Sequence, residues 1–165
     1  MKYSNYIHCI VILIVALTWT ACDSNDPDPP ENDDASALFF GDWNLTGAND
    51  DSGSRLGDLA NRYNFIEAEF ATDTTFALVL DSNNETVPDV NLTGTFNATL
   101  SESLMRLMAD FNGTPVSLTF GYEFTDESQQ EVAFMTTTSQ TDVLNLAIGT
   151  DFSGPTTLTF SRIED

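Results

Sequence analysis

The sequence predicts an all-β domain, and the main observation is a two-residue hydrophobic period that dominates the chain after residue 38. Residues 91–100 and 116–124 alternate polar side chains with apolar or small ones. Successive side chains of a strand point to opposite faces, so this period indicates antiparallel strands with one buried and one wet face. Thr, Phe and Val, which favour strands, are frequent in these segments. Turn-forming clusters such as 81–84 and 153–155 separate them.

We expect eight strands and two short helices. The strands are expected near residues 42–47, 63–71, 74–81, 91–100, 115–125, 131–138, 142–149 and 156–163. Residues 54–62 carry apolar side chains at helical spacing, and 101–110 start with a serine cap and end before Asn112-Gly113. Eight antiparallel strands favour a closed up-and-down barrel. A β-sandwich is the alternative architecture.

The N-terminus has the features of an export signal. Lys2 precedes the apolar run 9–17, which is less than half the length of about 20 residues that a membrane-spanning helix needs. Small residues, Thr20 and Ala21, stand directly before Cys22. This pattern resembles the cleavage box of bacterial lipoproteins, which implies a signal peptide over 1–21 and acyl chains on Cys22. The alternative is an ordinary signal peptide with an incidental cysteine.

Residues 22–37 are rich in Asp, Asn, Ser and Pro, and they precede the expected barrel domain over 38–165. Such a stretch buries too little apolar surface to offset its ordering entropy, so we expect a disordered acidic tether. Anchor and tether together predict a protein held by lipid in the cell envelope. The outer membrane, on its periplasmic or surface face, is the expected place, and the membrane and leaflet remain open.

Composition makes catalysis improbable. His8 is the single histidine, and both it and Cys9 leave with the signal peptide, while lipid would consume Cys22. The mature chain would then lack the commonest general base and the cysteine nucleophile, and no disulfide would be possible. We therefore predict a protein that is not an enzyme and has no cofactor. A carboxylate pair such as Glu67 with Glu69 is imaginable as a catalytic site, but a place on the wet face is expected.

The charge is strongly negative. Four arginines and no lysine remain after residue 21, against 26 acidic residues, which gives a formal charge of −22. Such a surface repels nucleic acid and anionic headgroups. The acidity fits adaptation to high salt, where screening relieves self-repulsion. Calcium binding at residues 49–53 is the alternative, although the segment lacks the ligand spacing of an EF-hand, and we assign no metal site.

A family resemblance appears where the domain opens. Gly41 and Trp43 in the sequence Phe-Gly-Asp-Trp resemble the Gly-x-Trp motif in the first strand of lipocalins and their bacterial lipoprotein relatives. The resemblance implies that Trp43 closes one end of the barrel. It also implies that Arg162, near the end of the last strand, packs across the indole ring, a contact that contributes about 0.5–2 kcal/mol.

The resemblance implies a small hydrophobic ligand inside the barrel. The candidate lining residues are aromatic and are expected to point inward: Phe76, Phe96, Phe120, Tyr122, Phe134 and Phe160. The alternative is a structural or protein-interaction lipoprotein with a filled core. Ligand sites have volumes of roughly 300–1,000 Å³, so a cavity of several hundred cubic ångströms would favour ligand binding. A closed core with an exposed apolar patch would favour interaction. The oligomeric state is left open.

Overall fold

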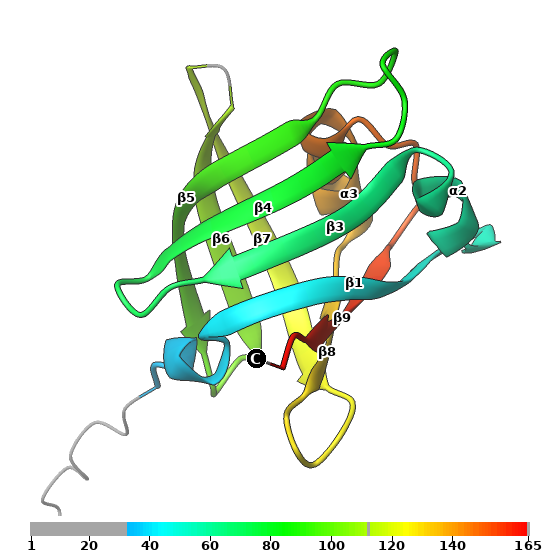
Figure 1. Ribbon diagram of the computed structural model, residues 1–165. Helices are drawn as coiled ribbons and strands as arrows, with labels where there is room; N and C mark the ends of the chain where they lie inside the picture. The colour runs from blue at the N-terminus through cyan, green and yellow to red at the C-terminus, as the bar shows by residue number, and fades with distance from the viewer. Residues whose placement is uncertain (1–32, 112, 165) are drawn as a thin grey trace, which may run out of the picture. The chain divides into compact units, whose positions relative to one another are not determined.

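The structure, a computed structural model, describes residues 33–111 and 113–164 (Figure 1). Its elements, in chain order, are η1 (Ser36–Leu38), β1 (Gly41–Asp50), β2 (Gly53–Ser54), α2 (Leu56–Ala60), β3 (Tyr63–Phe70), β4 (Thr75–Ser82), β5 (Val90–Thr99), β6 (Leu104–Phe111), β7 (Thr114–Phe124), β8 (Glu131–Met135), α3 (Thr138–Ile148) and β9 (Thr157–Arg162).

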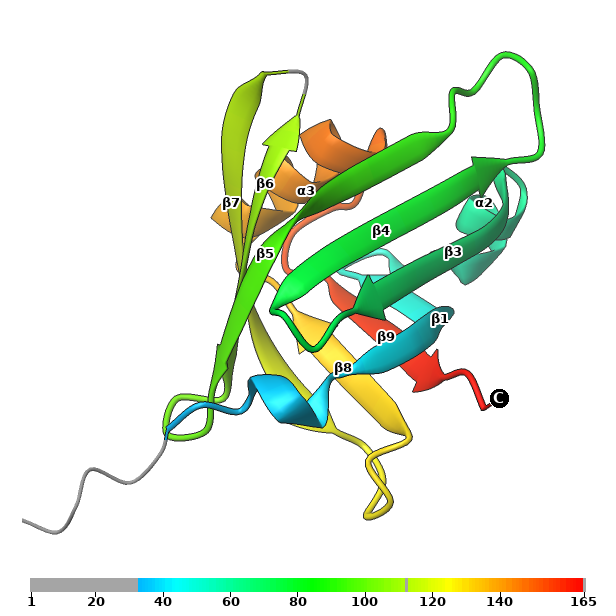
Figure 2. The same ribbon diagram turned by 60° about the vertical axis from the view of Figure 1, so that its left-hand side comes forward.

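Eight of these strands form a closed antiparallel barrel. The sheet order β2-β1-β3-β4-β5-β6-β7-β8-β9 follows the sequence, and an additional pairing of β1 with β9 closes the ring. The closing register runs from Trp43 opposite Arg162 to Asn49 opposite Thr157. Figure 2 shows β9 beside both β8 and β1. The predicted all-β up-and-down barrel is therefore confirmed, and the sandwich alternative is wrong.

Burial follows the predicted alternation, and one continuous hydrophobic core fills the barrel. In β5, Leu92, Phe96 and Ala98 are at most 3 % exposed, while Thr93, Thr95 and Asn97 between them face solvent. Side chains of this kind, each contributing about 1.5–3 kcal/mol on full burial, stabilise a domain in which no disulfide is expected.

The helix expected over 101–110 is wrong, because most of this segment is strand β6. Met105 and Leu107 are buried, whereas Arg106 and Met108 are exposed, so the segment follows a period of two. Its apolar residues fit either period in the sequence. Pairing with β5 on one side and β7 on the other decides the outcome, because both edges of the backbone are then hydrogen-bonded.

The strand expected over 142–149 is also wrong, because this segment belongs to helix α3. Leu144, Ala147 and Ile148 are buried at helical spacing, and Leu146 is 73 % exposed. Gly149 ends the helix with φ of 67°, a left-handed cap that glycine adopts without strain. No strand is required here, since β9 already pairs with both β8 and β1.

The tether expected to reach residue 37 ends earlier. Ala35 and Ser36 are each 2 % exposed, and the Ala35 N–H donates to the Ala98 carbonyl oxygen at 2.9 Å. Residues 33–37 are therefore part of the barrel domain, since their backbone pairs with β5. The expected signal peptide, Cys22 and the first part of the tether, residues 22–32, lie outside the described residues.

Candidate functional site

One end of the barrel is closed by the segment before β1 together with the end of β9. Trp43 is fully buried, and its Nε1 donates to the Phe39 carbonyl oxygen at 2.7 Å. The Arg162 guanidinium carbon lies 4.4 Å from the Trp43 ring centroid, so the stacking that the family resemblance implied is present. Arg162 also donates to the carbonyl oxygens of Leu38 and Phe40. A single cation therefore fixes the ring and the incoming chain together.

Gly41 has a steric role at the same end. Its φ is +125°, which side chains rarely tolerate, and a Cβ there would lie 3.0 Å from an Arg162 guanidinium nitrogen. The Gly-x-Trp spacing thus lets Arg162 reach past Gly41 to the backbone oxygens while it covers Trp43.

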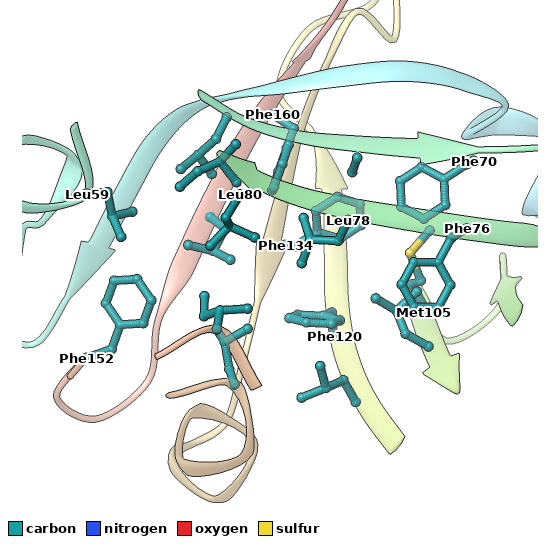
Figure 3. A pocket seen from close by; sticks show the side chains of 18 residues that line it. Leu59, Phe70, Phe76, Leu78, Leu80, Met105, Phe120, Phe134, Phe152 and Phe160 are labelled. Atoms are coloured by element: carbon teal, nitrogen blue, oxygen red, sulfur yellow. The ribbon is translucent and has the colours of Figure 1, made fainter. Parts of the chain in front are cut away.

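Inside the barrel is a cavity of about 50 Å³ whose 18 lining side chains are all apolar (Figure 3). Strands β1, β3, β4, β6, β7, β8 and β9 contribute to it, and α2, α3 and the loop before β9 cover it. Leu78 is half-buried, and the other lining side chains are buried. The cavity is therefore largely screened from solvent, and its apolar lining offers water no hydrogen-bond partners.

Four of the six predicted lining residues border this cavity: Phe76, Phe120, Phe134 and Phe160. Phe96 and Tyr122 are buried but do not line it. Phe96 packs edge-on against Phe40, and Tyr122 packs edge-on against Phe39 at 4.9 Å between ring centroids. The reason is that Phe39, fully buried, enters the barrel at the closed end and fills the space there.

Tyr122 has its hydroxyl satisfied. The phenol donates to the Thr99 carbonyl oxygen at 2.9 Å, and burial raises the pKa of Tyr122 above its usual value. The phenol therefore stays neutral and acts as part of the closed end.

Sequence reasoning missed the residues that cover the other end. Leu59 comes from α2, Ile148 from α3 and Phe152 from the loop that follows. Alternation along a strand gives no signal for such residues. Leu144, from the segment that was expected to be a strand, also lines the cavity, but from α3.

The two parts of this cover are joined by Arg55. Its guanidinium donates to the carboxylates of Asp58, Asp50 and Asp151 at 2.7–2.8 Å, and these bonds, Asp58 foremost, raise the pKa of Arg55 above its usual value. The same guanidinium lies 5.8 Å from the Phe152 ring centroid. Arg55 thus holds the loop that carries Phe152 against the start of α2.

Asp50 belongs to the acidic segment 49–53 that suggested calcium. Its carboxylate accepts hydrogen bonds from the Ser153 and Ser52 N–H groups and from Arg55, and the Ser153 bond is the main cause of its lowered pKa. The Asp50 carboxylate therefore helps to hold together the segments that cover this end of the barrel. Among residues 33–111 and 113–164, no three His, Cys, Asp or Glu side chains are grouped so as to hold a metal ion.

The remaining expectations concern surface residues. Glu67 and Glu69 do not line the cavity, and Glu69 is exposed. The exposed large apolar side chains come from six different parts of the chain: Phe65, Leu100, Met108, Met135, Leu146 and Ile163.

No protein-family model matches the chain, and no curated protein matches it either. Within the described residues, no helix has the length and apolar character to cross a bilayer.

Proposed function

We propose that this protein is a lipid-anchored cell-envelope protein whose barrel binds a small apolar molecule. The observation that carries the proposal is the interior cavity with its wholly apolar lining. Engineered cavities of about 150 Å³ lined by Leu, Ile and Phe bind benzene or xenon. The cavity here has the same chemical character at about a third of that volume, about 50 Å³. The fold class and the Trp43–Arg162 contact support a lipocalin-like protein as part of the same proposal.

The size of the cavity limits the ligand. Its volume of about 50 Å³ does not reach the several hundred cubic ångströms that would favour binding of a drug-sized molecule, whose sites are roughly 300–1,000 Å³. The closed barrel therefore suits a very small apolar molecule or the apolar end of a larger one. A longer chain requires lining side chains to change rotamer, which interior packing at close density resists.

Binding is tested with native mass spectrometry of the protein purified from its own cells and with benzene added to the purified protein. We expect a co-purifying apolar molecule and benzene-induced shifts of the cavity methyl groups by NMR. Ala68→Val, which adds two carbons inside the cavity, weakens benzene binding. Ala133→Val on β8, which does not line the cavity, is the matched control. A protein that is empty and also ignores benzene would refute the carrier and favour the structural or interaction alternative.

The anchor is tested separately by labelling cells with palmitate. Lipidation of Cys22 predicts labelled protein in the membrane fraction and its loss in Cys22→Ser. Unchanged labelling of Cys22→Ser would refute the anchor and leave the barrel proposal untouched.

A further inference from the structure

A second pocket, of about 150 Å³, lies against the same wall of the barrel as the interior cavity. It is bounded by α2, β1 and the first half of β3: Asn44, Leu45, Leu56, Leu59, Ala60, Tyr63, Asn64, Phe65 and Ile66. Three of these side chains, Leu45, Leu59 and Ile66, also line the interior cavity. The two spaces are therefore separated by one layer of apolar side chains.

The pocket exists because β1 and β3 separate. Their pairing ends at Asn44 opposite Glu67, after which β1 continues along β9 and turns into β2 and α2. Figure 1 shows α2 next to the start of β3, beside this divergence. Leu59 of α2 fills the space that a further strand pair would close, and Figure 3 shows it reaching toward the cavity side chains.

We propose that this outer pocket, here called the side pocket, is the entrance to the barrel and the head-group site of its ligand. The proposal rests on the proposed function and names the ligand class. The ligand is a neutral amphiphile, such as an alcohol or amide, whose alkyl chain runs from the side pocket between Leu45, Leu59 and Ile66, so that only its apolar end enters the cavity. Its head group stays in the side pocket.

The chemistry of the side pocket favours a neutral head group. Its lining contains two asparagines and no charged side chain. Asn64 donates to Asp81 at 2.7 Å, and Asn44 makes no side-chain hydrogen bond to another described residue, so its amide is available to a ligand. A carboxylate would meet no cation among the lining side chains, in a chain whose formal charge is −21. Exposed Phe65 at the rim gives the alkyl chain an apolar first contact.

The layer opens by side-chain motion. Leu59 sits on a helix of five residues and is 4 % exposed, with empty volume on both sides. A rotamer change at Leu59 joins the two spaces without breaking a strand pair. Such changes take nanoseconds or less at exposed positions, and longer where neighbours must move.

The test compares 1-octanol with octanoate at pH 7, by calorimetry and methyl NMR on the full protein, with benzene as a probe that has no head group. Octanol should bind at least about tenfold more tightly than octanoate, because the carboxylate would be desolvated without a partner. Leu59→Trp should weaken octanol by about tenfold or more. Leu146→Trp, on an exposed site of α3, should leave it within about twofold of the wild-type value.

Two further variants keep the test decisive if Leu59→Trp does not fold. Leu59→Ala should admit longer alcohols such as decanol, and Asn44→Ala should weaken octanol but not benzene. The side-pocket proposal would be overturned if octanol and octanoate bind equally, neither Leu59 variant has an effect, and benzene still binds. That outcome would leave the proposed function intact. Failure of both octanol and benzene to bind would overturn both proposals.

Discussion

Arg162→Met is the substitution that most directly probes the closed end of the barrel. Methionine keeps an unbranched apolar stem above the Trp43 ring but removes the charge and every donor. The wild-type guanidinium lies 4.4 Å from the ring centroid and donates to two carbonyl oxygens, those of Leu38 and Phe40. The variant therefore leaves these two oxygens without their donor.

The expected loss of stability follows from these three interactions. A hydrogen bond from a charged donor contributes about 1.5–3 kcal/mol, and a cation–π contact about 0.5–2 kcal/mol. Because Arg162 is only partly buried, we use the lower end of the range for its two hydrogen bonds. Together with the cation–π contact, Arg162→Met should then lower the unfolding free energy by about 4 kcal/mol. That is a large share of the roughly 5–15 kcal/mol by which a domain is stable.

Urea unfolding of the chain that begins after residue 21 measures this loss. Trp43 is then the single tryptophan, and it is fully buried, so its fluorescence reports the transition. With a slope of about 2 kcal/mol per molar urea, the midpoint should fall by about 2 M. Arg106→Met, at an exposed position of β6, is the control and should change little. Equal midpoints for the two variants would show that the Arg162 contacts do not stabilise the barrel.

Three other predictions concern the acidic cover, a close approach and the helix register. Asp50→Asn should destabilise at pH 7, and its difference from wild type should vanish in acid. The lowered pKa of Asp50 means that its carboxylate stabilises the fold at pH values above the usual carboxyl range, and that this stability is lost as the pH falls through the folded-state pKa. Urea midpoints of the variant and the wild type from pH 7 to pH 2 measure the difference. A difference that persists at pH 2 contradicts the prediction. Gly94→Ala should cost about 1–3 kcal/mol, because its Cβ would lie 2.0 Å from the Met108 carbonyl oxygen. Gly57→Ala should raise the unfolding free energy by about 0.5–1 kcal/mol, because a Cβ there would lie in open space on α2. Thermal unfolding that finds Gly94→Ala more stable than Gly57→Ala refutes the argument. Leu144→Ala should cost about 2–5 kcal/mol and Leu146→Ala less than about 0.5 kcal/mol, since these are 2 % and 73 % exposed; similar losses would contradict the helix.

The alternation of polar and apolar residues was sufficient to predict the barrel strands, because a strand with one solvent-exposed face shows in its sequence which side chains point inward. Seven of the eight expected strands coincide with strands of the barrel. The two errors fall where apolar residues fit both periods. Residues 104–108 became strand because β5 and β7 pair with them, and 144–148 became helix because β8 and β9 already close the ring without them. Those outcomes depend on partners distant in sequence, which a local pattern does not contain.

The candidate site divides in the same way. Phe76, Phe120, Phe134 and Phe160 lie on strands, and alternation places them inward. Phe96 and Tyr122 also point inward, yet the cavity does not reach them because Phe39 fills the closed end. The cover residues of α2 and α3 required knowledge of which end of the barrel stays open. That depends on how the chain packs outside its strands.

The few cations of the chain explain why the two ends of the barrel differ. Outside these ends the acidic surface repels itself, and that repulsion is long-range and screened by salt. Arg162 and Arg55 act at contact distance instead, one across the indole of Trp43 and one among three carboxylates. Arg162 ties strand β9 to the incoming chain within the barrel wall, so that end is fixed. Arg55 ties the start of α2 and the last residue of β1 to the loop carrying Phe152, so the end it secures includes short segments outside the barrel wall. Beside Arg55, the side pocket and the cavity are separated by a single layer of side chains that includes Leu59. We therefore expect the proposed ligand to enter at the end held by Arg55.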